Sequence, residues 1–210
     1  MSLVTYRLER DAADRLLFLF HGYSAEQHHL AAYVPLVDPD ERFSAICPRA
    51  IHDLPDGDGA SWFGIDENGF DKDSFHDAAA TLRAFVDAEA EAAGVPLERC
   101  VIGGFSQGGY LALALAGQPG AAKYAGVWAM CCALPPFADT PFDLTGGEGR
   151  AALVQFGTGD PFVSNADSNA AASALRDGGW NVRTEGYDMA HSQTLEMMVD
   201  AREWLTTVDS

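Results

Sequence analysis

One serine in this chain stands in a spacing that suits it for nucleophilic attack. Ser106 is the centre of Gly104-Phe105-Ser106-Gln107-Gly108, which reads G-x-S-x-G. A strained turn of this kind lifts the hydroxyl clear of its surroundings, and it needs glycines because side chains there would collide with neighbouring backbone. The chemistry predicted is acyl transfer through a covalent acyl-enzyme. The plainer alternative is a glycine-rich turn whose serine only caps a helix.

A serine needs a base, and His191 is the predicted one. Of six histidines, only His191 follows Ser106, and a serine on a strand-to-helix turn is followed first by its acid and then by its histidine. His191 also lies in a loop between a strand expected at 181–186 and a helix expected at 193–206, which Ser192 is placed to cap. The alternative is a solvated surface histidine.

The acid that orients this base must lie between the two, and Asp160 is preferred. It follows 151–157, the best buried-strand pattern in the C-terminal half, and the carboxyl ends of parallel strands line the ligand crevice. Asp188 is the main rival because it is close to His191, whereas Asp167 suits the first turn of the next helix. The other candidates are Asp139, Asp143, Asp177, Glu148 and Glu185.

Two backbone N–H groups are predicted to form an oxyanion hole. The apolar run 16–20 leads directly into His21-Gly22-Tyr23, and such a motif after an early strand supplies one N–H group in many hydrolases. We therefore assign the Tyr23 N–H and the N–H of Gln107, just after the serine. His21 is expected to be structural, buried and hydrogen-bonded.

Strands and helices alternate around these residues. Strands are expected near 3–8, 16–21, 43–47, 99–104, 124–130, 151–157 and 181–186, and helices near 27–36, 74–93, 107–117, 166–177 and 193–206. This alternation predicts an α/β fold in which a mostly parallel central sheet has helices on both faces. The length, 210 residues, favours a single domain over 1–210.

Several ordered motifs make the chain resemble the phospholipase/carboxylesterase family of small α/β-hydrolases, which includes acyl-protein thioesterases and bacterial carboxylesterases. They are Phe20-His21-Gly22, Pro48-Arg49, Ser61-Trp62-Phe63, Gly104 to Gly109, Gly159 to Val163, and His191-Ser192. The resemblance implies the triad Ser106, Asp160 and His191, an α/β-hydrolase fold with little or no cap domain, and no cofactor.

The chain departs from many of these relatives at two positions. Where they carry H-G-x-G, the second glycine is replaced by Ser24, and where they carry a histidine before the acid loop, this chain has Phe156. The first change concerns the conformation of the oxyanion loop. The second implies different surroundings for the acid.

Two long stretches without a regular pattern, 49–73 and 132–150, are read as walls of the substrate pocket, since long loops in a compact domain are often functional. The alternative is that they pack on the protein's own core. The predicted pocket residues are Trp62, Phe63, Leu134, Phe137 and Phe162.

The amino-acid composition makes some classes of binding partner improbable. The net charge is −18, with 31 acidic and 13 basic residues, and such a surface repels nucleic acid and anionic membranes. It suits either a salty cytoplasm or an ordinary acidic enzyme from a GC-rich genome. No signal peptide or membrane span is expected, and the four cysteines show no metal spacing, so a cytoplasmic protein with reduced thiols and no bound metal is predicted.

These observations predict a serine carboxylesterase that hydrolyses neutral short-to-medium acyl esters, with a small-molecule ester as its partner and a homodimer left open. One alternative is a long-chain acyl thioesterase or lysophospholipase with the same triad. Another is a silent α/β-hydrolase that serves as a binding module, although silent relatives usually lose one triad residue. The natural substrate, the acyl length and the preference for ester or thioester do not follow from the sequence.

Overall fold

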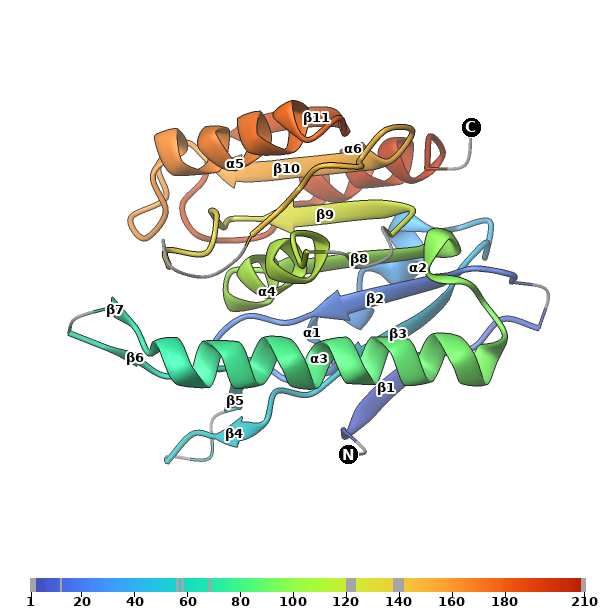
Figure 1. Cartoon of the computed structure of the whole chain (residues 1–210), viewed down its shortest axis with the longest axis horizontal. Coiled ribbons are helices and arrows are strands. Elements are labelled where there is room, and N and C mark those ends of the chain that lie inside the picture. Colours follow the sequence, from blue (N-terminus) through green and yellow to red (C-terminus); the bar gives the residue numbers. More distant parts are fainter. Residues whose placement is uncertain are drawn as a thin grey trace.

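A seven-stranded sheet runs through the molecule (Figure 1). The computed structural model describes residues 3–11, 13–55, 57, 59–67, 69–119, 124–137 and 142–208. The strand order is β1-β3-β2-β8-β9-β10-β11, and all neighbours are parallel except β1 and β3. The strands are β1 (Thr5–Leu8), β2 (Leu16–Phe20), β3 (Ser44–Pro48), β8 (Cys100–Phe105), β9 (Gly126–Met130), β10 (Ala151–Gly157) and β11 (Asn181–Tyr187). The predicted mostly parallel sheet is confirmed.

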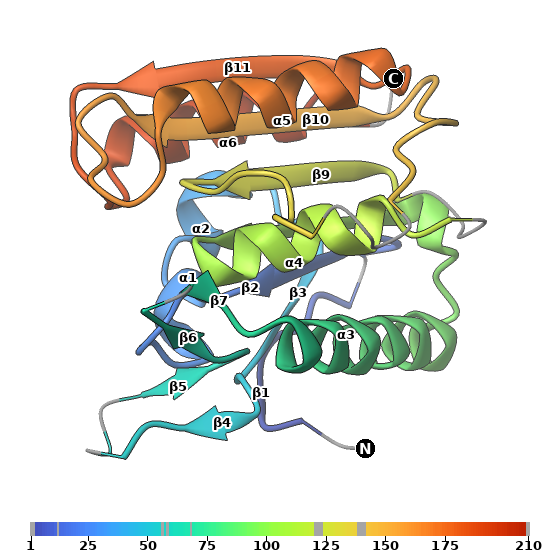
Figure 2. The ribbon, with the colours of Figure 1, turned by 60° about the vertical axis from the view of Figure 1, so that its left-hand side comes forward.

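Helices cover both faces of this sheet (Figure 2). On one face lie α3 (Lys72–Ala93), α4 (Gln107–Ala116) and α5 (Asn165–Asp177). On the other lie α1 (His28–Ala31), α2 (Val34–Val37) and α6 (Leu195–Leu205). None of the described helices has both the length and the apolar character needed to cross a bilayer.

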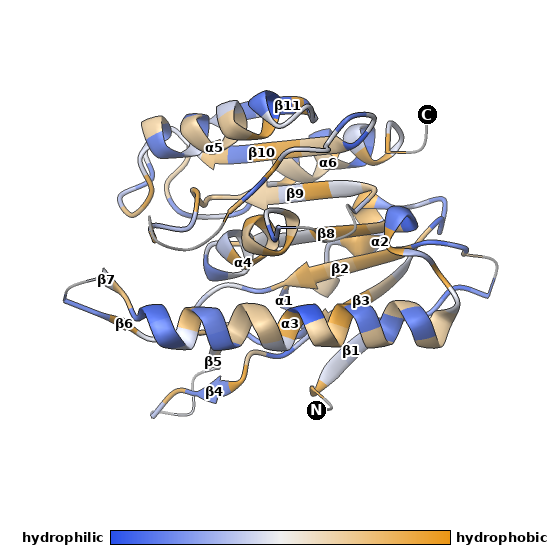
Figure 3. Cartoon of the chain, in the orientation of Figure 1, coloured by the Kyte–Doolittle hydropathy of each residue, from blue (hydrophilic) through white to orange (hydrophobic). Residues whose placement is uncertain are grey.

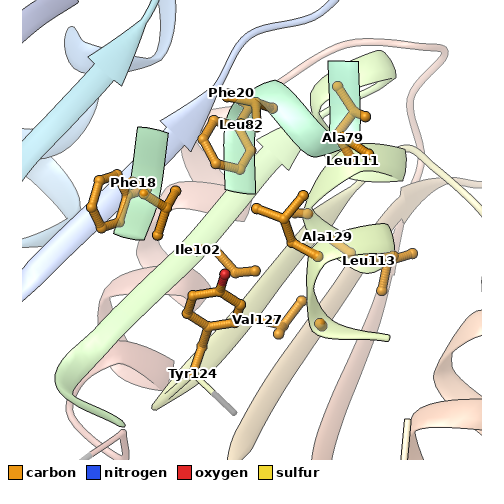
Figure 4. Packing of buried hydrophobic residues seen from close by; sticks show 14 of the residues in the cluster. Phe18, Phe20, Ala79, Leu82, Ile102, Leu111, Leu113, Tyr124, Val127 and Ala129 are labelled. Carbon is orange, nitrogen blue, oxygen red and sulfur yellow. The ribbon is translucent and has the colours of Figure 1, made fainter. Parts of the chain in front are cut away.

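The core forms because the strands are apolar on both sides. Alternate residues of a strand point to opposite faces, so Phe18 and Phe20 pack with α3 and α4, while Leu17 and Leu19 pack on the α1, α2 and α6 side. Figure 3 shows the resulting hydrophobic colouring of the central strands, and Figure 4 shows Phe20 beside Leu82 of α3. This continuous burial is typical of parallel sheets.

The helix predicted at 27–36 is two short helices instead. Pro35 stands in the first turn of α2, where its missing N–H is tolerated. Because it has no N–H to donate to the carbonyl four residues earlier, at Ala31, the first helix does not continue through it. The cap of the last helix also differs from the prediction, because Thr194 rather than Ser192 accepts the Met197 N–H. Ser192 instead donates its hydroxyl to the Gln193 carbonyl.

The stretch 49–73, expected to be irregular, contains two small hairpins. One pairs β4 (His52–Asp53) with β5 (Ala60–Ser61), and the other pairs β6 (Ile65–Asp66) with β7 (Gly69–Phe70). A one-turn 3-10 helix, η1 (Leu97–Arg99), precedes β8. The β6–β7 hairpin projects at the end of the sheet toward which the parallel strands point (Figures 1 and 2).

The strand order reverses between β2 and β8. The chain runs from β2 outward to β3, then crosses back and continues through β8 to β11. Such a switch point, at the carboxyl ends of the strands, is where open α/β sheets bind ligands. Phe20 of β2 is paired with Gly104 of β8, so the chain leaving β2 and the turn leaving β8 begin side by side.

Candidate active site

Ser106 occupies a strained turn between β8 and α4. Its φ and ψ are 53° and −120°, a region that side chains other than glycine rarely adopt. Its N–H donates to the Met130 carbonyl at 2.9 Å, which fixes the turn to the end of β9. The hydroxyl group lies at the start of α4 and lines a cavity together with His191.

The two glycines of the motif are required by backbone contacts. A Cβ atom on Gly108 would lie 2.0 Å from the Phe20 carbonyl oxygen, and one on Gly104 would lie 2.3 Å from the Gly108 carbonyl carbon. Both positions are therefore closed to larger residues. The close approach also presses α4 against the end of β2.

The predicted oxyanion donors lie on the two segments that this contact brings together. Gln107 is the first residue of α4, so its N–H has no acceptor within the helix. The chain from β2 passes against the turn, because a Cβ atom on Gly22 would lie 3.4 Å from Ser106 Cβ. Tyr23 follows directly and lines the same cavity as Ser106 and Gln107.

Ser24 occupies the position of the second glycine in the H-G-x-G pattern and adopts a backbone conformation typical of glycine. Its φ is 60°, in the left-handed region that favours glycine. Its N–H donates to the Ala60 carbonyl at 3.0 Å. The loop thus adopts the backbone conformation that suits glycine, although the residue is a serine.

Asp160 lies in the turn that follows β10, and its side chain is fully buried. One carboxylate oxygen accepts the N–H groups of Phe162 and Val163 at 2.8 and 3.1 Å. The other accepts a hydrogen bond from His191 Nδ1 at 2.7 Å. The predicted acid and base, 31 residues apart in sequence, are therefore in direct contact.

The loops that carry these two residues are joined by backbone hydrogen bonds. Thr158 N–H donates to the Tyr187 carbonyl at 2.7 Å, and Gly159 N–H donates to the Met189 carbonyl at 3.0 Å. A Cβ atom on Gly157 would lie 2.4 Å from the Met189 carbonyl oxygen. The glycines before Asp160 thus allow its loop to approach the histidine loop.

His191 is held between two aromatic rings. The ring centroids of Phe105 and Phe162 lie 4.8 and 5.2 Å from that of the imidazole. Because Nδ1 donates to Asp160, the neutral ring carries no proton on Nε2, which is free to accept one. The side chain of Asp188, the rival acid, is exposed, while Asp167 bonds to Ser164 at the start of α5, as expected for a helix first turn.

The other candidate acids do not contact His191 in the described part of the chain. Asp143 accepts from Thr145, Glu185 pairs with Arg183, and Asp177 ends α5. Glu148 packs beside Gly179. Asp139 lies outside the described residues.

The Gln107 side chain joins the serine turn to Ser61-Trp62-Phe63. Its Oε1 accepts the Trp62 N–H at 3.0 Å, and its Nε2 donates to the Phe63 carbonyl at 2.9 Å. Ser61 Oγ donates to the Phe63 carbonyl at 2.7 Å and accepts a hydrogen bond from Gln107 Nε2 at 3.2 Å. The two most specific sequence motifs therefore form one buried hydrogen-bonded unit.

His21 is buried and doubly hydrogen-bonded, as predicted. Its Nδ1 donates to the Gly22 carbonyl at 2.8 Å, and its Nε2 accepts the Ala50 N–H at 3.0 Å. Burial lowers the pKa of His21 to about 4. The ring is therefore neutral near pH 7, and its hydrogen bonds link the predicted oxyanion loop, which begins at Gly22, to Ala50.

The cavity beside Ser106 has a volume of about 420 Å³. Its lining comprises Tyr23, Ile65, Phe70, Phe105, Ser106, Gln107, Tyr110, Phe162, Val163 and His191. Of the predicted pocket residues, Phe162 lies here, and Phe63 reaches an adjoining hollow that shares Tyr23 and Ile65.

The remaining predicted pocket residues are placed elsewhere. Trp62 is fully buried, where its Nε1 donates to the His21 carbonyl at 2.8 Å, so it supports the site from within the core. Leu134 and Phe137 line a second cavity, of about 450 Å³. An aromatic residue in a loop can turn toward either core or substrate, and the sequence pattern does not distinguish the two.

Five residues of this lining were not predicted from the sequence: Ile65, Phe70, Phe105, Tyr110 and Val163. A signal for Tyr110 was present, because residues four apart on a helix share a face and Tyr110 is four residues after Ser106. Ile65 and Phe70 come from the unpredicted β6–β7 hairpin.

One cluster of possible metal ligands is found among the described residues, formed by Cys131, Asp160 and His191, whose ligand atoms lie within 4.8 Å of one another. Asp160 and His191 already bond to each other. Burial raises the pKa of the Cys131 thiol to about 11, which keeps it protonated near pH 7. This arrangement fits an acid–base pair better than a metal centre.

Comparisons with known proteins agree with this geometry. The model of the phospholipase/carboxylesterase family matches residues 7–209. Acyl-protein thioesterase 1 of Debaryomyces hansenii is 31% identical over 156 residues, which cover 70% of this chain and 66% of that protein, slightly less than two thirds of its length.

Solved structures share the fold at lower identity. The crystal structure of the Bacillus cereus carboxylesterase superposes with a TM-score of 0.85 at 21% identity, covering 98% of this chain and 94% of that one. Esterase PE8 gives a TM-score of 0.85 at 22% identity, covering 99% and 100%. The protein therefore belongs to the phospholipase/carboxylesterase family of α/β-hydrolases and is a carboxylic ester hydrolase.

Proposed function

We propose that this protein is a serine carboxylesterase that hydrolyses neutral short-to-medium acyl esters through Ser106, His191 and Asp160. The observation that carries the proposal is the 2.7 Å hydrogen bond from His191 Nδ1 to the buried Asp160, with His191 and the strained Ser106 lining one cavity. A nucleophile, a base and an orienting acid are the three groups that acyl transfer requires.

In the first half-reaction, Ser106 Oγ attacks the ester carbonyl while His191 Nε2 takes the hydroxyl proton. The Tyr23 and Gln107 N–H groups stabilise the oxyanion. Asp160 holds the Nδ1–H tautomer and stabilises the positive charge that the imidazole acquires. His191 then gives its proton to the leaving alcohol, and the acyl group stays on Ser106.

In the second half-reaction, His191 takes a proton from water, and the hydroxide attacks the acyl carbonyl. His191 then returns this proton to Ser106 Oγ as the bond between Oγ and the acyl carbon breaks and the acid is released. Because the same imidazole must be neutral at the start of both steps, acidification should suppress the rate. The aromatic rings beside His191 limit its rotation, which favours the geometry needed in both directions.

The lining of the cavity supports neutral substrates. None of its described residues is an Asp, Glu, Lys or Arg, so a charged acyl chain would find no partner there. The net charge of −18 further disfavours anionic esters at low salt.

A second candidate function is supported by one comparison. The similar Debaryomyces hansenii protein is named an acyl-protein thioesterase, and a thioester would use the same proposed triad. A long-chain thioesterase or lysophospholipase therefore remains the rival, distinguished by acyl length and leaving group. The predicted cytoplasmic location is supported by four unpaired cysteines; the homodimer stays a prediction.

The decisive experiment measures kcat/KM for p-nitrophenyl acetate through palmitate, with matched acyl thioesters. We expect an optimum at short-to-medium chains. Ser106→Ala should lower kcat by roughly 10⁴–10⁶-fold and remain folded, and a phosphonate should label the wild type once, on Ser106.

Each alternative gives a different result. An optimum at palmitate or at thioesters would support the rival enzyme. A Ser106→Ala variant that keeps more than about a tenth of the activity would exclude the proposed nucleophile. No turnover of any ester would favour the binding module.

A further inference from the structure

Two cavities lie along the same helix. The cavity that contains Ser106 and Tyr110 is called the serine pocket, and the cavity lined by Phe75, Ala79, Ala114, Leu134 and Phe137 is called the back cavity. Their volumes are similar, about 420 and about 450 Å³. Tyr110 and Ala114 are four residues apart on α4, so the back cavity begins about one helical turn, roughly 5.4 Å, beyond the serine pocket.

Aromatic rings stand between the two cavities. Phe70, from the β6–β7 hairpin, meets Tyr110 edge to face with centroids 4.9 Å apart. On its other side Phe70 contacts Phe63 at 4.9 Å, and Phe63 contacts Phe75, a wall of the back cavity, at 5.0 Å. A continuous set of ring contacts thus runs from one cavity to the other.

The two rings in contact, Phe70 and Tyr110, belong to elements of different length. Tyr110 is part of α4, a helix of ten residues that packs against β8 and β9. Phe70 sits in a hairpin whose strands contain two residues each. A substitution of Phe70 therefore removes one of the two rings without disturbing a long helix or strand.

Both cavities suit hydrocarbon. Within the described part of the chain, neither lining contains an Asp, Glu, Lys or Arg, and the back cavity adds proline, alanine and phenylalanine side chains. Its polar members are His76 and Gln118. An unbranched acyl chain bound at Ser106 would bury methylene groups along this path.

We propose that Phe70 and Tyr110 form a closed partition that limits the acyl chain to the serine pocket, and that the back cavity binds the distal part of a long acyl chain once the partition is opened. The inference rests on the proposed esterase function. It assigns Phe70 and Tyr110 as specificity-determining residues and gives a physical reason for a short-to-medium optimum.

The test compares acyl-length profiles of the wild type and Phe70→Ala on p-nitrophenyl esters from acetate to palmitate. Opening the partition should move the optimum to longer chains, with a gain of about fourfold in kcat/KM for each added methylene that becomes buried. The quantity measured is the ratio of laurate to butyrate rates, because Phe70 lines the pocket for every substrate.

Two further variants distinguish a connection between the two cavities from a simple enlargement of the serine pocket. Ile65→Ala enlarges the serine pocket away from the ring contacts and should change the ratio by less than about fourfold, the effect of one methylene. Phe70→Ala combined with Ala114→Phe fills the back cavity and should return the ratio toward that of the wild type. A folded Phe70→Ala enzyme with an unchanged profile, or a gain that survives Ala114→Phe, would overturn the inference.

A binding measurement keeps the partition testable apart from catalysis. Displacement of a bound fluorescent dye by 1-hexanol and 1-dodecanol requires no ester hydrolysis. Phe70→Ala should favour dodecanol over hexanol more strongly than the wild type does, and equal preference in both would overturn the partition. If no ester is turned over but this difference is seen, the proposed esterase function fails and the partition stands.

Discussion

At the scale of single residues, both carboxylate oxygens of Asp160 accept hydrogen bonds. Two backbone N–H groups bind one oxygen and His191 binds the other. Asp160→Asn places an NH₂ group against one of these donors, which disturbs the His191 tautomer. We expect kcat to fall by about 10⁴-fold, the effect of the same change in a well-studied triad.

Asp188→Asn is the matched control, because that side chain is exposed and its loss should change kcat less than about twofold. Steady-state kinetics on one ester, with circular dichroism to verify folding, measures both variants. A larger loss in Asp188→Asn than in Asp160→Asn would move the acid to Asp188.

His21 makes stability depend on pH. Its folded pKa is about 4, lowered from 6.5 by burial, so between these values the unfolded chain binds more protons than the folded one. Acidification from pH 6.5 to 4 should therefore destabilise the fold by about 3 kcal/mol through this group, and the stability is present above pH 6.5.

Urea unfolding at pH 7, 6 and 5 measures this effect. His21→Gln should be less stable at pH 7 but should lose less free energy of unfolding on acidification. His52→Gln, at an exposed position, should keep the wild-type pH dependence. Parallel pH curves for the wild type and His21→Gln would refute the assignment.

The site residues that the sequence could predict are those that come soon after the end of a strand. Ser106, Asp160 and His191 follow strands, and chain order together with strand position predicted that they lie close together. In the structure His191 contacts Asp160 and shares a cavity with Ser106, while their catalytic roles are the proposal that the variants test. Trp62 and Phe70 depend on how a loop folds over the core, and no local pattern encodes that. The sequence therefore placed the chemistry better than the shape of the pocket.

At the scale of elements, Ser24 holds its loop in a conformation that costs a serine energy. Its φ of 60° is disfavoured for residues with a Cβ. Ser24→Gly should therefore raise the free energy of unfolding by about 1 kcal/mol. Ser173→Gly, at an exposed position within α5, should lower it by about 0.5 kcal/mol.

Thermal or urea unfolding distinguishes these opposite signs. A destabilised Ser24→Gly variant would mean that its side chain stabilises the loop by more than the backbone strain costs. The measurement thus decides whether the serine is tolerated or required.

The elements themselves followed from burial and periodicity. All seven strands of the main sheet were predicted within two residues. Five of them, β2, β3, β8, β9 and β10, are runs of almost entirely buried residues, whereas the edge strands β1 and β11 are largely exposed or half-buried. The two hairpins were missed because strands of two residues are too short to show alternation. The break between α1 and α2 was encoded by Pro35, whose effect the apolar pattern around it obscured.

At the scale of the whole molecule, the charge of −18 predicts that salt stabilises the fold. The distance beyond which ions screen the repulsion between exposed carboxylates falls from about 10 Å at 0.1 M salt to about 3 Å at 1 M. Raising KCl from 0.1 to 1 M should increase the free energy of unfolding by about 1 kcal/mol or more, equivalent to about 2–4 °C in Tm for a chain of this size.

A variant with Asp40, Glu91 and Glu98 changed to lysine tests the cause. These side chains are exposed, and three reversals of two units each change the net charge from −18 to −12. Its Tm should depend less on KCl than that of the wild type. Equal slopes would show that general salt effects, rather than self-repulsion, determine the response.

The proposed catalytic residues fall into two groups that are separate in sequence, one before β10 and one after it. Ser106, Tyr23 and Gln107 precede the exposed turn at Glu148 and Gly149, whereas Asp160 and His191 follow it together with β10, β11, α5 and α6. The pieces meet along the parallel pairing of β9 with β10. A chain cut at this turn would yield one fragment with an unassisted nucleophile and another with an acid–base pair but nothing to activate. Ester hydrolysis would then report on whether the two fragments have found each other, which makes this fold a natural basis for a split-enzyme sensor.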